Sequence, residues 1–148
     1  MARWEIKNVG MKGVAMTVPE NVVKTSELGL LSQEEADVFD NTVGIKERHI
    51  APDTMCASDM CQAAAEKLLE ELGWEKDSID VLLFESVTGD YRTPPTSCIL
   101  QDRLGLSENC FCMDIPMGCC GCMYAITVAG TLLTACLLYT SPSPRDGA

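Results

Sequence analysis

The segment from Cys110 to Ile126 constrains the fold of this chain more than any other. Residues 110–115 are typical of a short buried strand, and they run into a turn that contains Gly118. No charged side chain occurs from residue 115 to residue 144, so the turn is expected to open a long apolar helix. Backbone N–H groups at the start of a helix favour a thiolate, and Cys119 lies at that point. The segment therefore predicts a strand–turn–helix unit with a reactive cysteine.

Helices and strands are expected to alternate along the rest of the chain. Apolar residues recur at helical spacing through residues 57–72, and Gly73 and Gly105 are typical residues at helix ends. The expected elements are an opening strand at 14–23, a short helix near 25–30, a helix at 57–72, a buried strand at 78–84, a helix at 96–104 and a strand at 110–115. This order indicates an α/β fold in layers around a parallel sheet.

The composition of the chain argues against some classes of function. The chain has 22 acidic and 11 basic residues and a net charge of −11, which argues against a nucleic-acid-binding protein because such proteins need a basic face. The first residues are charged and lack the apolar core of a secretory signal. Nine cysteines without such a signal favour a reducing compartment, so we expect a cytoplasmic protein. The uncharged stretch is rich in Gly, Thr, Ala and Cys, which favours a buried helix over a membrane span.

The density of cysteines leaves a second interpretation open. Five of the nine lie close together: Cys110, Cys112, Cys119, Cys120 and Cys122. Zinc sites usually pair two C-x₂₋₄-C knuckles, and this spacing fits them poorly, so we expect no metal but retain a cysteine-rich metal-binding module as an alternative. Cys56, Cys61 and Cys98 are expected to be buried and inert, the usual state of a free cysteine.

Four motifs in order along the chain resemble one enzyme family, and the first is the opening strand at residues 14–23, with which its members begin. The pattern Asp-Ile-x-x-x-Cys-x-Gly-x-x-Tyr-Ala at residues 114–125 resembles the nucleophile turn of the beta-ketoacyl-acyl-carrier-protein synthase III family. Residues 41–50 resemble the family's Thr-Gly-Ile-x-Glu-Arg signature, with Val43 in place of Thr. Residues 86–94 resemble its Thr-x-Thr-Pro-Asp-Tyr-x-x-Pro loop. Together the motifs extend the resemblance over residues 1–135.

The resemblance implies a thiolase-like layered fold, here an incomplete first half-domain with a central buried helix. It implies decarboxylative Claisen condensation, in which Cys119 accepts an acyl group from acyl-CoA or another acyl thioester. Malonyl-acyl carrier protein would be the second substrate, and the backbone N–H of Cys119 would contribute to the oxyanion hole. The family forms homodimers, needs no cofactor, and takes its decarboxylating His and Asn from a second half that this sequence does not contain. The chain alone is therefore expected to be inactive.

Some positions depart from the family pattern. Val38 and Thr42 occupy positions where members that use coenzyme A often have Trp and Arg, so the adenine-stacking platform is missing. Thr93 replaces a Phe that in some members covers the acyl pocket of the partner subunit, and a smaller side chain there would leave room for a longer or branched acyl group. Cys120 stands where the family has Ser or Ala, and Cys122 where it often has an aromatic residue.

Another branch of the thiolase fold is a further alternative, either a hydroxymethylglutaryl-CoA-synthase-like enzyme or a natural-product synthase. Glu85 would then have to act as an acid, although a Glu at a strand end is more often solvated. Arg48 is expected to make structural ion pairs, and His49, the one histidine of the chain, is expected to be structural.

Residues 136–148 are expected not to belong to the domain. The run from Cys136 to Asp146 resembles the translation of a transposon-end sequencing adapter. We predict that resequencing the source locus will show coding sequence that continues the helix beyond Ala135 and differs from Cys136 onward. Finding the same tail in independently prepared genomic DNA would refute this interpretation.

Overall fold

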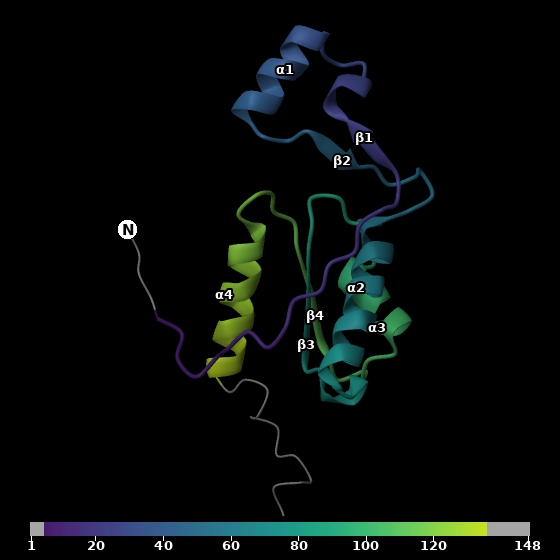
Figure 1. Cartoon of the computed structure of the whole chain (residues 1–148). Helices are drawn as coiled ribbons and strands as arrows, with labels where there is room; N and C mark the ends of the chain where they lie inside the picture. The colour runs from purple at the N-terminus through teal and green to yellow at the C-terminus, as the bar shows by residue number, and fades with distance from the viewer. Residues whose placement is uncertain (1–4, 136–148) are drawn as a thin grey trace, which may run out of the picture.

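The computed structural model describes residues 5–135, and the expectation about residues 136–148 lies outside them. The elements follow one another as β1 (Val22–Lys24), η1 (Thr25–Glu27), α1 (Gln33–Thr42), β2 (Glu47–His49), α2 (Ala57–Leu72), η2 (Lys76–Ser78), β3 (Val81–Glu85), α3 (Thr96–Leu104), β4 (Phe111–Ile115) and α4 (Gly121–Thr134). Figure 1 shows them in two groups, with α1, β1 and β2 apart from the remainder.

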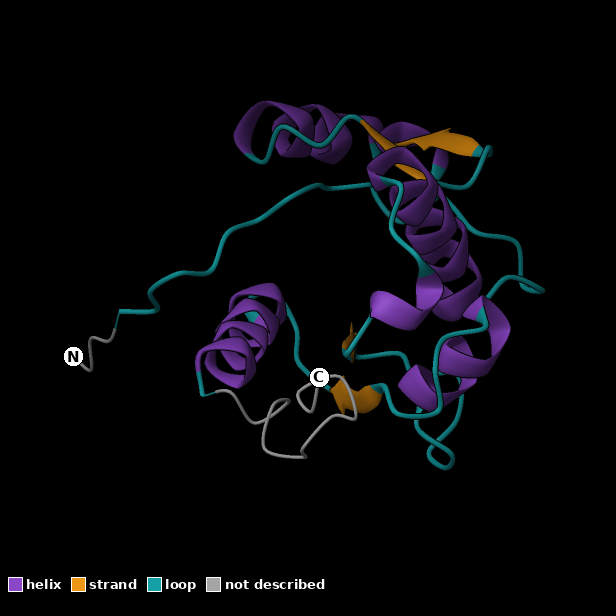
Figure 2. Ribbon diagram, turned by 90° about the horizontal axis from the view of Figure 1, so that it is seen from below, coloured by secondary structure: helices purple, strands orange, loops and turns teal. Residues whose placement is uncertain are grey.

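The larger group is built on two parallel strands. β3 pairs with β4 in a register that places Val81 opposite Phe111 and Glu85 opposite Ile115. Helix α3 connects these strands, and Figure 2 shows α3 and α4 on opposite sides of them. A small core forms where α3 meets β3, around Phe84, Leu100 and Leu104. The strand pair and its two helices thus provide the α/β layers that the alternation of elements predicts.

The smaller group is held together around Thr25, which is 2% exposed. Its hydroxyl donates to the Ile45 carbonyl at 2.8 Å and accepts from Arg48 Nη1 at 3.1 Å. The Arg48 guanidinium also lies 5.3 Å from the centre of the Phe39 ring, a cation–π contact. Arg48 therefore has the structural role expected of it, but it binds a hydroxyl and a ring, and among residues 5–135 it forms no ion pair.

Helices α2 and α3 begin and end at the residues predicted from the sequence. Gly73 and Gly105 follow them with φ angles of 63° and 64°, the left-handed conformation in which glycine is favoured because it lacks a Cβ atom. β3 starts three residues later than predicted, because residues 76–78 form a 3₁₀ turn in which Ser78 N–H donates to the Glu75 carbonyl at 2.9 Å.

The predicted opening strand is mostly wrong. Only Val22–Lys24 is a strand, and it pairs with β2 in the smaller group. Residues 5–20 make no backbone–backbone hydrogen bond within the described part of the chain, and Val14 and Met16 are exposed. An alternating apolar pattern suits a strand only where a neighbouring strand supplies the ladder. The helix expected near 25–30 is also shorter, a 3₁₀ turn at Thr25–Glu27.

Burial of the cysteines is only partly as expected. Cys110 is buried, but Cys56, Cys61 and Cys98 are exposed, which contradicts their assignment as buried residues. Cys56 precedes the first turn of α2. Helix α2 packs mainly against α3, so its side chains that point away from α3 are exposed to solvent.

Helix α4 packs on β3 and β4 with one of its sides, and its buried residues are Gly121 and Gly130. Within residues 5–135, no helix is both long and apolar enough to cross a membrane.

Candidate functional site

Cys119 lies in a tight turn between β4 and α4. The chain reverses after β4, where the Ile115 carbonyl accepts from Met117 N–H at 2.9 Å. The turn then closes through a bond from Gly121 N–H to the Gly118 carbonyl at 2.8 Å, with Cys119 and Cys120 as its central residues. Helix α4 begins at Gly121, and the Cys119 side chain is exposed. The structure thus has the strand–turn–helix unit predicted around this cysteine.

The turn presents several free backbone donors. Among the described residues, the N–H groups of Cys119, Cys120 and Cys122 have no hydrogen-bond partner, whereas Gly121 and Met123 donate to carbonyls of the turn. Free N–H groups at the start of a helix attract negative charge, and an oxyanion hole is made from donors of this kind. An exposed thiol and unpaired donors therefore occur within one turn, an arrangement suited to acyl transfer.

Glu85 is brought to the same turn from β3. It is the last residue of that strand, opposite Ile115, and its carboxylate packs so closely on Gly121 that a Cβ atom at position 121 would overlap it. The side chain is half-buried, not solvated as expected for a strand end. Among residues 5–135 it forms no salt bridge. A larger residue at position 121 would therefore displace the Glu85 side chain, and a carboxylate lies beside the first turn of α4.

Asp114 fixes the position of α3 relative to β4. Its two carboxylate oxygens accept from the backbone N–H groups of Thr96 and Ser97, at 2.7 and 2.8 Å. Both donors belong to fully buried residues at the first turn of α3. Pro95 precedes that turn and has no side-chain acceptor, so the first N–H groups of α3 need an acceptor from another element. Asp114, the first residue of the motif at residues 114–125, is thus a structural anchor, a role that the sequence pattern did not reveal.

We predict that Asp114→Ala will release the first turn of α3. Two buried N–H groups would lose charge-assisted bonds that contribute about 1.5–3 kcal/mol each, so amide exchange at Thr96 and Ser97 should accelerate by about 100-fold or more. Hydrogen exchange followed by mass spectrometry of the peptide containing these residues would measure this. Asp102→Ala, at the exposed end of α3, is the matched control, and equal acceleration in both variants would contradict the anchor.

The loop at residues 86–94 is tied to the helices around it. Asp90 accepts from the Ser58 hydroxyl, and Asp90 N–H donates to Thr96 Oγ1 at 3.1 Å. Arg103 Nη1 donates to Ser58 Oγ at 2.9 Å and pairs with Asp59 at 3.0 Å. These contacts hold α2, α3 and the loop in one position, although no sequence motif pointed to them.

Three of the positions that depart from the family pattern lie outside this turn. Val38 and Thr42 belong to α1 in the smaller group, where the Thr42 hydroxyl donates to the Val38 carbonyl. Thr93 is exposed in the loop before Pro94. His49 Nδ1 lies 2.6 Å from the Pro19 carbonyl oxygen, a contact in keeping with a structural role. The structure does not bring these residues into the turn that carries Cys119.

Cys112 differs from Cys119 in environment. Burial of the Cys112 thiol, with Cys110 and Cys98 beside it, raises its pKa to about 12, so it stays protonated at neutral pH and is a poor nucleophile. In the part of the chain that the structure describes, no three His, Cys, Asp or Glu side chains come together as metal ligands.

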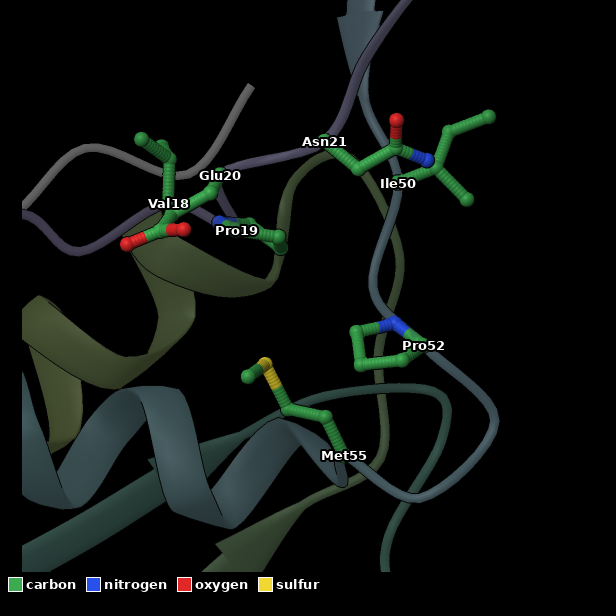
Figure 3. Close-up of a pocket in the computed structure, with 7 residues that line it drawn as sticks. All are labelled: Val18, Pro19, Glu20, Asn21, Ile50, Pro52 and Met55. Atoms are coloured by element: carbon green, nitrogen blue, oxygen red, sulfur yellow. The ribbon is translucent and has the colours of Figure 1, made fainter.

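One pocket lies away from this turn. It has a volume of about 490 Å³, and Figure 3 shows the side chains of its lining, which come from residues 18–21 and from Ile50, Pro52 and Met55. Neither Cys119 nor Glu85 lines it. The candidate site at the turn before α4 is therefore separate from this pocket.

Comparisons with known proteins point to one family. No family model matches the chain. It is 36% identical over 124 residues to the beta-ketoacyl-[acyl-carrier-protein] synthase III of Geobacillus kaustophilus, a match that covers 84% of this chain and 40% of that protein. It is 37% identical over 119 residues to the protein of the same name from a Sulfurovum species, covering 80% of this chain and 35% of that one.

Solved structures of similar fold include proteins with names of the same kind. A 3-oxoacyl-(acyl-carrier protein) synthase from Burkholderia xenovorans matches with a TM-score of 0.76 and 33% identity, over 82% of this chain and 36% of that one. An OleA structure from Xanthomonas campestris matches with a TM-score of 0.72 and 25% identity, over 83% and 40%. These neighbours confirm the thiolase-like fold as an incomplete half-domain. The chain spans about two-fifths of the length of the curated relatives that it matches.

Proposed function

We propose, from its membership of the beta-ketoacyl-acyl-carrier-protein synthase III family, that this chain carries the acyl-accepting part of a condensing enzyme. The single observation that supports this most directly is the turn before α4, where the exposed Cys119 thiol lies among unpaired backbone N–H groups. The whole enzyme would be an acyltransferase of fatty-acid or related biosynthesis.

In the first step, the Cys119 thiolate attacks the carbonyl carbon of an acyl thioester. The carbonyl oxygen gains negative charge, and the N–H of Cys119, with its neighbours in the turn, stabilises that charge. The carbon–sulfur bond of the thioester then breaks, the carrier leaves as a thiol, and the acyl group remains on Cys119. The proposed donor is acyl-CoA or another acyl thioester.

In the second step, malonyl-acyl carrier protein loses CO₂ and the resulting carbanion attacks the acyl group on Cys119. The lost carboxylate leaves its electron pair on the attacking carbon, and the Cys119 sulfur departs as a thiolate. Decarboxylation would depend on a His and an Asn outside this sequence. For the whole enzyme we also propose a homodimer in the cytoplasm, in keeping with a chain whose described cysteines are free thiols.

Glu85 supports a second candidate function. A carboxyl group beside the turn of Cys119 is what a hydroxymethylglutaryl-CoA-synthase-like enzyme would need as its acid. The two candidates differ in substrate, because the first consumes malonyl-acyl carrier protein and releases CO₂. Loss of activity in Glu85→Gln together with no release of CO₂ would favour the second.

Acylation of Cys119 tests the proposed function. A full-length homologue with the same residues at positions 114–125 would be incubated with acyl-CoA, quenched in acid and digested. We expect the mass of one acyl group on the peptide that contains Cys119, removable by hydroxylamine as a thioester. Acylation of another cysteine, or of none, would refute the assignment.

A further inference from the structure

Two exposed thiols flank the start of α4 in a C-x-x-C arrangement. Cys119, Cys120, Gly121 and Cys122 are consecutive, and the first and last of them are separated by the turn that closes onto Gly121. Both end cysteines are exposed and free. Their spacing and position after a strand are typical of dithiol sites that undergo oxidation and reduction.

The backbone brings these two cysteines to a distance that a disulfide can bridge. Cys119 is in the turn and Cys122 in the first turn of α4, so they lie three positions apart on a nearly helical path. On a helical path, residues three positions apart have Cα atoms about 5 Å apart, and disulfides span Cα separations of about 4.4–6.8 Å. Gly121, between them, has no side chain to hinder the approach.

The remaining cysteines are poorer partners for Cys119. Cys120 is its direct neighbour, and residues adjacent in a helical path do not face each other. Cys110 is buried and lies at the opposite end of β4 from the turn. Cys112 lies within β4 and is half-buried.

We propose that Cys119 and Cys122 form a reversible disulfide, which makes this turn a site of oxidation by hydroperoxides. The Cys119 thiolate would attack one oxygen of hydrogen peroxide, giving a sulfenic acid and hydroxide. The Cys122 thiol would then attack that sulfur and displace its oxygen as water. Two thiols lose two electrons in all, and the peroxide is reduced to two molecules of water. A dithiol reductant restores both thiols by exchange.

The effect of this disulfide on activity rests on the proposed function, because the Cys119 sulfur would also carry the acyl group. A Cys119 sulfur held in a disulfide cannot attack a thioester, so oxidation would stop acyl transfer until a thiol reductant arrives. Cys122 would then have a role distinct from catalysis, as the resolving partner that keeps Cys119 from irreversible oxidation.

A full-length homologue with the same residues at positions 114–125 tests the disulfide. Reduced protein would be treated with hydrogen peroxide, blocked with iodoacetamide and digested, and the peptide that contains both residues would be analysed by fragmentation mass spectrometry. We expect a loss of two mass units with Cys119 joined to Cys122, recovered fully by dithiothreitol. Cys122→Ser should abolish this species and leave Cys119 as sulfinic acid, whereas Cys120→Ser should form the disulfide as before.

Three outcomes would overturn the proposal: a predominant link between Cys119 and Cys120, a link from Cys119 to a distant cysteine, or the same mixture of links in folded chain and in chain unfolded by urea. The test is independent of acyl transfer. If the disulfide forms while acyl-CoA modifies another residue in the full-length homologue, the proposed function fails and the redox pair remains.

Discussion

Replacing Cys119 by Ala in a full-length homologue with the same turn is expected to abolish the acyl-enzyme completely. In the proposed mechanism the Cys119 thiolate receives the acyl group, and neither Cys120 nor Cys122 is placed in the same position relative to the N–H groups of the turn. Condensation should fall by about 10³-fold or more, the scale of losses when a nucleophile is removed. Acid-quenched protein analysed by intact mass would show no added acyl group.

Two matched variants separate loss of the nucleophile from loss of structure. Cys120→Ala and Cys122→Ala change exposed thiols next to Cys119 and should retain the acyl-enzyme. Circular dichroism spectra of all three variants should overlay. An acyl adduct of normal yield in Cys119→Ala would show that another residue is the acceptor.

The 148-residue chain alone is expected to show no malonyl-dependent condensation and to self-associate. In the described residues, β3 and β4 form a sheet of only two strands, so each has one edge whose backbone groups are unpaired. Helix α4 also exposes large apolar side chains, namely Met123, Tyr124, Ile126 and Leu133. Open edges and an apolar face of this kind favour association with other chains. Light scattering of the purified chain should give polydisperse particles larger than a dimer.

A parallel assay of CO₂ release from malonyl-acyl carrier protein should stay at the level of a blank. Adding 1 M urea should reduce particle size if exposed apolar surface drives association, because urea solvates such surface. A monodisperse monomer with cooperative melting and turnover would contradict both parts of this prediction.

The bounds of helices α2 and α3 in the larger group could be predicted from local signals in the sequence. The apolar stripe of residues 57–72 and the glycines at 73 and 105 act through neighbours three to five positions away, so the bounds of α2 and α3 could be derived from sequence alone. The turn at Cys119 was found for the same reason, because strand, glycine and uncharged helix follow one another directly.

Features that depend on distant partners were not predictable in this way. Residues 14–18 carry an apolar alternation, but whether they form a strand depends on a neighbour that the pattern does not name. The contact of Glu85 with Gly121 joins the end of one strand to the start of a helix, and the bonds from Asp114 cross to another element. Cys61 was misjudged because its helix has fewer packing partners than its apolar stripe suggests.

The anchor at Asp114 has a consequence for the order in which the molecule folds during synthesis. It joins residues only 17 and 18 positions apart, and the β3–α3–β4 unit that it closes has short sequence separations throughout. Units with short separations pay little loop-closure entropy and form early. We expect this unit to fold soon after residue 115 leaves the ribosome, so that the turn that carries Cys119 forms against a folded β3–α3–β4 unit before later parts of the polypeptide emerge.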